Sequence, residues 1–103
     1  MDKIEKLVVA ANTDPSKLAG AITPQLKDFD EVVIECVGSN SLGVAIKACI
    51  ISRSHLARND FDLQMTPCFI EIKNKRKEEV KKDEEVKDFI NGYRLSIVKV
   101  KIE

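Results

Sequence analysis

Residues 38–43 read Gly-Ser-Asn-Ser-Leu-Gly and have the G-x-x-x-x-G spacing of a phosphate-binding loop, just before a helical pattern. A nucleotide-hydrolysing loop continues with Lys and then Ser or Thr, which reach the phosphates and hold magnesium, whereas Val44 and Ala45 follow here. Nucleotide hydrolysis is therefore not expected. Two interpretations remain. The free amides at the helix start, beside three small polar side chains, hold an isolated phosphate, or the segment is a capped helix start with a glycine needed for the turn.

The cysteines and the single histidine form no recognisable catalytic or metal-binding set. Cys36, Cys49 and Cys68 lie within apolar segments and lack the close pairs of a zinc site or a redox motif. We interpret them as buried thiols in a reducing compartment. His55 has no partner at a spacing typical of a general base, so it is interpreted as an interface or surface residue. No enzymatic activity, metal or cofactor is expected.

The charge distribution suggests binding rather than catalysis. Residues 1–72 carry seven Lys or Arg against ten Asp or Glu, whereas residues 73–103 carry ten against seven, in a chain of zero net charge. A basic C-terminal third on an acidic body is a weak signature of an arm that binds a polyanion. The alternative is an ordinary solvated segment, because acids alternate with the bases. Candidate phosphate contacts are Lys17, Ser39, Asn40, Ser41, Lys47, Lys73, Lys75, Arg76 and Lys77.

Length and composition indicate a single globular domain over residues 1–103. The chain is 44% hydrophobic and 33% charged, which is typical of neither disordered nor fibrous proteins. Its apolar runs are too short to span a bilayer, and the N-terminal residues lack the pattern of a signal peptide. We therefore predict a cytoplasmic protein without a membrane partner.

Hydrophobic periodicity predicts the elements of this domain. A first strand begins near Ile4 and runs to about residue 11. A helix then begins at Pro15, capped by Asp14 or Thr13, and Pro24 predicts a kink or a restart within it. Residues 31–37 are nearly continuous β-branched and apolar sequence, which is typical of a central strand.

The second half of the chain predicts a helix and two further strands. A helix spans about residues 42–56, capped by Ser39, Asn40 or Ser41. A long strand covers 61–73, where Pro67 indicates an edge position or a bulge. Residues 74–88 are almost entirely charged and are interpreted as an insertion, either a hairpin or loop or a helical stretch. Asn91 and Gly92 predict a turn before a last strand over 94–102.

This β-α-β-α-β-β order predicts a two-layer α/β sandwich. Right-handed crossovers place both helices on one face of a four-stranded mixed sheet.

The second helix carries more apolar residues than one buried face requires. One stripe contains Leu42 and Ile46, and a second stripe is formed by Val44, Ala48 and Ile51, with His55 at its end. Because so small a chain cannot bury both sides of a helix, the second stripe is predicted to be the interface of a homodimer.

Several segments together resemble the stage V sporulation protein S family, a branch of the Alba-like nucleic-acid-binding proteins. The matching segments are Lys-Leu-Val-Val at 6–9, Asp-Pro-Ser-Lys-Leu-Ala-Gly-Ala-Ile at 14–22, the stretch from Val37 to Arg53, and Phe-Asp-Leu-Gln-Met-Thr-Pro-Cys-Phe at 61–69. The resemblance implies the same α/β sandwich, a dimer, and a role in binding DNA or RNA. It also implies phosphate contacts from the loop before the second helix and from the last hairpin, and a link to spore formation and septation control.

The leading hypothesis is therefore a dimeric, nucleic-acid-binding regulatory protein that is not an enzyme. The alternative is a protein–protein interaction module on the same dimeric scaffold.

Overall fold

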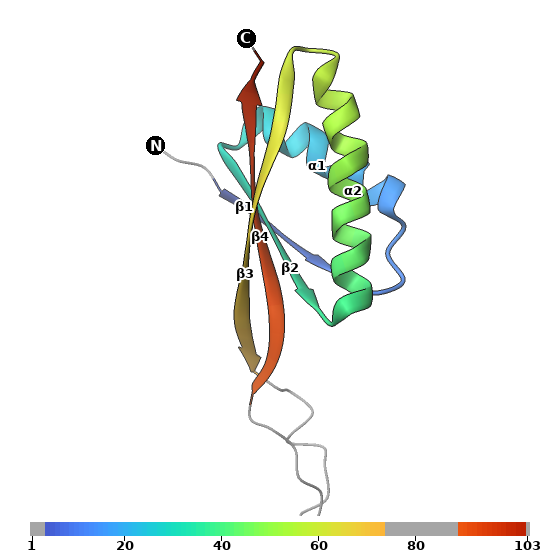
Figure 1. Ribbon diagram of the computed structural model, residues 1–103, viewed down its shortest axis with the longest axis vertical. Helices are drawn as coiled ribbons and strands as arrows, with labels where there is room; N and C mark the ends of the chain where they lie inside the picture. The colour runs from blue at the N-terminus through green and yellow to red at the C-terminus, as the bar shows by residue number, and fades with distance from the viewer. Residues whose placement is uncertain (1–3, 74–88, 103) are drawn as a thin grey trace, which may run out of the picture.

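The computed structural model describes residues 4–73 and 89–102, which form two helices packed on one side of a sheet (Figure 1). The elements are β1 (Ile4–Val9), α1 (Pro15–Asp28), β2 (Glu31–Val37), α2 (Ser39–Ala57), β3 (Phe61–Lys73) and β4 (Phe89–Lys101). The sheet order is β1-β2-β4-β3; β1 and β2 run parallel, whereas β4 is antiparallel to both of its neighbours. The predicted α/β two-layer sandwich with a mixed sheet is confirmed. The predicted insertion at residues 74–88 lies outside the described residues.

Helix α1 begins at the predicted position. The Asp14 side chain accepts a hydrogen bond from the Ser16 amide at 3.1 Å, and Pro15 occupies the first turn, where its missing N–H costs nothing. Leu18, Ala19, Ile22 and Leu26 are buried against the rest of the core. Of the kink or restart predicted at Pro24, the restart is wrong, since α1 is one helix from Pro15 to Asp28 with Pro24 inside it.

Strand β2 is central in the sheet, as its β-branched composition predicted. Val32, Ile34 and Cys36 are fully buried beneath the helices, and the residues between them lie on the opposite sheet face. Their partners across β4 include Ile97 and Leu95, which are also buried. The core is therefore the layer between this sheet face and the two helices. Among the described residues, no helix is long and apolar enough to cross a membrane.

Strand β3 is an edge strand, which explains how it accommodates Pro67. The pairing between β3 and β4 continues in a single register from Phe61 with Lys101 to Lys73 with Phe89. Of the two alternatives for Pro67, the edge position is correct, and the uninterrupted register excludes a bulge.

The predicted turn at Asn91 and Gly92 is wrong, because both residues lie within β4 and pair with Glu71 and Ile70. Gly92 is required here by close packing. A Cβ atom at this position would lie 2.7 Å from the Cys36 carbonyl oxygen and 2.8 Å from Ile72 Cδ1. The glycine therefore permits the backbone and an isoleucine side chain to approach β4 more closely than any other residue would.

We expect Gly92→Ala to destabilise the fold by about 2 kcal/mol, since the added methyl group meets backbone as well as side-chain atoms. Gly20→Ala is the matched control. It lies within α1 with nothing within 4 Å of the new Cβ, so alanine should stabilise by roughly 0.5 to 1 kcal/mol. Urea denaturation of both variants measures the difference. Equal stability of Gly92→Ala and the wild type would contradict the close approach.

Candidate nucleic-acid interface

The start of α2 is an open helix N-terminus. Gly38 precedes the helix with φ of 86°, a conformation that favours glycine, and it supplies no side-chain cap. The first turn contains no acidic residue. Backbone amides of a first helical turn have no acceptor within the helix, and together with the helix dipole they attract an anion. This end of α2 is therefore suited to hold a phosphate.

The three polar side chains of this segment have different surroundings. Ser39 and Asn40 are exposed, as a phosphate contact requires. Ser41 is buried, and its hydroxyl donates to the carbonyl oxygens of Val37 at 2.6 Å and Gly38 at 3.0 Å. The prediction that the Ser41 side chain contacts phosphate must therefore be corrected, because this hydroxyl ties the helix start to the end of β2.

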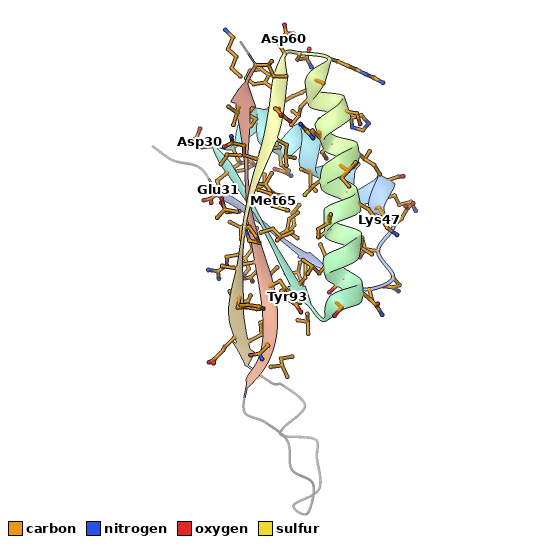
Figure 2. All side chains as sticks on the ribbon, in the orientation of Figure 1. Asp30, Glu31, Lys47, Asp60, Met65 and Tyr93 are labelled. Atoms are coloured by element: carbon orange, nitrogen blue, oxygen red, sulfur yellow. The ribbon has the colours of Figure 1, made fainter. Side chains whose placement is uncertain are left out.

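The predicted lysine contacts are only partly within the described residues. Lys17 and Lys47 are exposed, and neither has a salt-bridge partner among the described residues. Figure 2 shows Lys47 on the side of α2 turned away from the β3–β4 hairpin. Lys73 is the last residue of β3. Lys75, Arg76 and Lys77 lie outside the described residues.

The stripe predicted as the dimer interface instead packs within the chain. Ala48 is fully buried, and Val44 and Ile51 are half-buried against the core, so Ala48 has no surface to offer a partner. His55 is also half-buried, with its Nδ1 3.3 Å from Thr23 Oγ1 of α1. The interface prediction must therefore be corrected for Ala48, whereas Val44, Ile51 and His55 are only half-buried.

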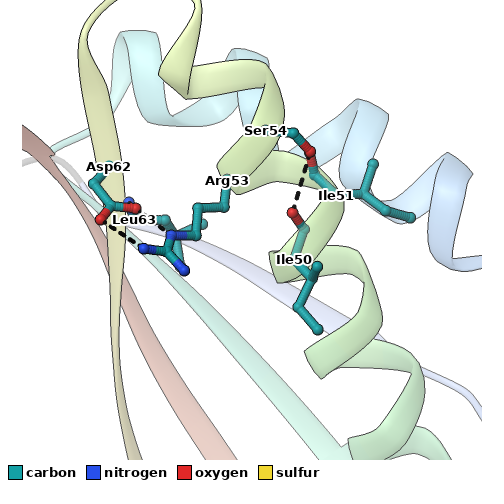
Figure 3. Close-up of polar contacts among 6 residues, drawn as sticks. All are labelled: Ile50, Ile51, Arg53, Ser54, Asp62 and Leu63. Carbon is teal, nitrogen blue, oxygen red and sulfur yellow. Dashed lines mark hydrogen bonds and ion pairs between the residues drawn. The ribbon is translucent and has the colours of Figure 1, made fainter.

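The physical reason is the line of small residues along α2. Ala45, Ala48 and Ser52 are fully buried, and the Ser52 hydroxyl donates to the Ala19 carbonyl oxygen at 3.3 Å. Small side chains let the helix lie close to α1 and the sheet, so much of the second stripe is covered within the chain. Figure 3 shows Ile51 directed toward α1 and Arg53 directed toward β3.

The apolar surface that remains uncovered lies on the β3 side of α2. Ile50 is 63% exposed, and Ile46 is 38% exposed. A shallow hollow of about 170 Å³, here called the Ile50 hollow, is lined by Ile46, Cys49, Ile50, Arg53, Leu63 and Met65. Arg53 closes one end through a bidentate ion pair with Asp62, at 2.6 and 3.1 Å (Figure 3).

A second, larger hollow lies toward the start of α2. This Phe69 groove has a volume of about 410 Å³ and is lined mainly by Leu42, Ile46, Met65, Pro67, Phe69 and Tyr93. Phe69 is 81% exposed and lies beside Tyr93, with ring centroids 5.7 Å apart. The sequence interpretation did not include this pair. The alternation of side chains along β3, which places Phe69 on the same sheet face as Met65, could have indicated it.

The sheet face opposite the helices carries a compact ion-pair network. Glu35 accepts from Lys6 at 2.6 Å and from Arg94 at 2.8 Å. The hydrogen bonds from these two cations lower the pKa of the Glu35 carboxyl below its ordinary value of 4.5. Ser96 donates to Glu31 on the same face. Because the charges of Lys6 and Arg94 share one acidic partner, this face offers less free positive charge than its residue types suggest.

The three cysteines are free, and two of them are inert by burial. Burial raises the pKa of Cys36, and burial together with the neighbouring Cys36 raises the pKa of Cys49 to about 11. Cys68 is exposed, so the prediction of burial is wrong for this residue, which lies on the edge strand and is paired with Arg94 of the sheet face opposite the helices. Within residues 4–73 and 89–102, no group of His, Cys, Asp and Glu side chains could hold a metal ion.

The arrangement defines an Alba-like α/β sandwich with an open helix start beside an apolar groove. Among solved structures it is similar to Alba from Thermoplasma volcanium, with a TM-score of 0.56 and 13% sequence identity over 92% of this chain and 98% of that chain. The chain belongs to the stage V sporulation protein S family, whose family model matches residues 5–87. The resemblance expected from the sequence is confirmed.

We expect Glu35→Gln to flatten the acid dependence of stability. Because the pKa of Glu35 is lower in the folded chain, its ionised form stabilises the fold above the ordinary value of 4.5, and this contribution is lost as the pH falls through the lower folded pKa. Urea denaturation at a series of acidic pH values measures the effect. Glu71→Gln, at an exposed position of β3, is the control. An unchanged pH profile for Glu35→Gln would contradict the role of the network.

Proposed function

We propose that this protein is a cytoplasmic, non-enzymatic regulator that binds DNA or RNA as a homodimer. The observation that carries the proposal is the uncapped N-terminus of α2, which has exposed Ser39 and Asn40 and no acidic residue in its first turn. Membership of the stage V sporulation protein S family supports it, because the resemblance to that family implies nucleic-acid binding.

The charges around α2 are consistent with contact to a phosphate backbone. Lys47 lies seven residues after Asn40 and so shares one side of the helix with it. A phosphate at the helix start would meet amides first, and a neighbouring phosphate would lie within reach of the long lysine side chain. Such contacts position a nucleic acid without reading its sequence.

The Ile50 hollow is a better candidate for the dimer interface than the stripe predicted from the sequence. An isoleucine that is 63% exposed at the middle of a helix, beside Leu63 and Met65 of β3, is apolar surface that a second copy would remove from water. A twofold axis near Ile50 would pair two α2 helices through the same surface.

Nucleic-acid binding at α2 should depend on salt and on Lys47. Lys47→Glu should weaken binding across all sequences and reduce the slope of log affinity against log salt by about one. Fluorescence anisotropy with labelled single-stranded and duplex oligonucleotides over a range of salt concentrations measures both quantities.

Lys27→Glu is the matched control, because Lys27 is an exposed lysine in the last turn of α1 and changes the net charge equally. If no oligonucleotide binds the wild-type protein at low salt, the proposed function is wrong. A stable protein partner recovered after nuclease treatment would then favour the interaction module.

The dimer should depend on Ile50. We expect Ile50→Glu to give a folded monomer, because a charge cannot be buried in an apolar interface without a partner. Light scattering measures the mass, and circular dichroism checks the fold. Gln64→Glu, at an exposed position of β3 on the sheet face opposite the helices, adds the same charge outside this surface and is the control that should remain dimeric. A dimeric Ile50→Glu protein would exclude this interface.

A further inference from the structure

The exposed ring of Phe69 lies beside Tyr93 in a groove that also reaches the first turn of α2. Phe69 and Tyr93 are directly paired across β3 and β4, and their rings are tilted by 42° with centroids 5.7 Å apart. Phe69 is 81% exposed, more than any other large hydrophobic residue among those described. Tyr93 is half-buried beneath the groove and supports the ring of Phe69 from one side.

The groove connects this aromatic pair to the open start of α2. Leu42, in the first turn of α2, lines the same groove as Phe69 and Tyr93. Figure 2 shows Tyr93 on the side of β4 that faces this end of the helix. The apolar Phe69 groove and the unpaired amides of α2 are therefore adjacent, and the elements that form them are held in place by the core.

We propose that the Phe69 groove binds an unpaired nucleobase, stacked on Phe69, while a phosphate of the same strand lies at the start of α2. This inference rests on the proposed function and specifies its ligand as single-stranded nucleic acid or an unpaired segment. Bases stack on aromatic side chains regardless of sequence, because every base has a flat π-face. A paired base in a duplex has both faces covered by its neighbours and cannot enter the groove.

The charges at the two ends of the groove indicate the direction in which a bound nucleic acid would run. Glu71 and Asn91 are the next pair on this face beyond Phe69 and Tyr93. The Glu71 carboxylate repels phosphates, whereas the positive end of the α2 dipole attracts them. The backbone of the nucleic acid should therefore leave the groove toward α2 and not along the hairpin.

The competing occupant of the groove is a second copy of the chain. The Ile50 hollow shares Ile46 and Met65 with the groove, but Phe69 and Tyr93 line only the groove. The helix start favours an anionic ligand at this end, because its unpaired amides would otherwise be covered by apolar surface from a partner.

Tyr93 provides a direct measurement, since it is the only tyrosine in a chain without tryptophan. A base stacked beside it should quench its emission. We expect a single-stranded oligonucleotide to bind and quench. An abasic oligonucleotide of the same length, which carries the phosphates without bases, should bind more weakly and leave the emission unchanged.

Variants of Phe69 separate stacking from apolar contact. Phe69→Ala should weaken single-strand binding by about tenfold and leave duplex binding unchanged. Phe69→Leu retains apolar volume but not the flat ring and should behave like Phe69→Ala. Phe69→Trp should restore binding, with its own emission as the reporter. Light scattering should show that all three variants remain dimeric.

The outcomes distinguish this inference from the proposed function. Salt-dependent binding without quenching, or with equal affinity for Phe69→Ala, overturns the stacking site and leaves the proposed function intact. Failure of every nucleic acid to bind at low salt overturns both. A monomeric Phe69→Ala protein beside a dimeric Ile50→Glu protein would show that the groove holds a second copy, which also overturns the stacking site.

Discussion

The packing of α1 and α2 on a single face of the sheet is the constraint on which the other features depend. Residues 4–73 and 89–102 contain two helices, and small residues without exposed surface make the contact between them close: Ala45, Ala48 and Ser52 of α2 and Ala19 of α1. Helix α1 packs against β2, and α2 packs against β1, β2 and β3. At the edge strand β3, the outer flank of α2 is the only cover that the described residues supply, and the residues of β3 beyond Pro67 are largely exposed. The exposed apolar surface at Ile50 and Phe69 is thus a consequence of the close packing between α1 and α2.

The opposite sheet face is stabilised by ion pairs rather than by packed helices. Neither α1 nor α2 covers this face. Glu35 pairs there with two cations from the neighbouring strands, and β-branched residues such as Val33 and Val98 are half-buried. The two faces therefore differ in what they offer a ligand. The helix side combines an apolar groove with unpaired amides, whereas the other side presents charges that are largely neutralised by one another.

The sequence predicted the architecture because each element carries a clear period. The β-branched run at 31–37, the Asp14-Pro15 start of α1 and the long strand with its proline at an edge all have local physical causes. The failures have causes that are not local. Gly92 resembles a turn glycine, yet its role is a contact with Cys36 and Ile72, which are distant in the sequence. The second apolar stripe of α2 became buried because small residues brought α1 close. Phe69 was not recognised as a site residue because its exposure depends on where α2 ends its cover of the sheet.

The pairing of β4 has a mechanical consequence. Residues 92–97 of β4 are bonded to β2 on one side and β3 on the other, whereas residues 89–91 are paired with β3 alone. Tyr93, together with its partner Phe69, lies next to the end of the three-stranded part. A two-stranded ribbon twists more freely than a wider sheet. The aromatic pair is therefore fixed to the stiff, three-stranded part of the sheet, and torsional compliance begins two residues beyond Tyr93, at Asn91, where the two-stranded segment starts.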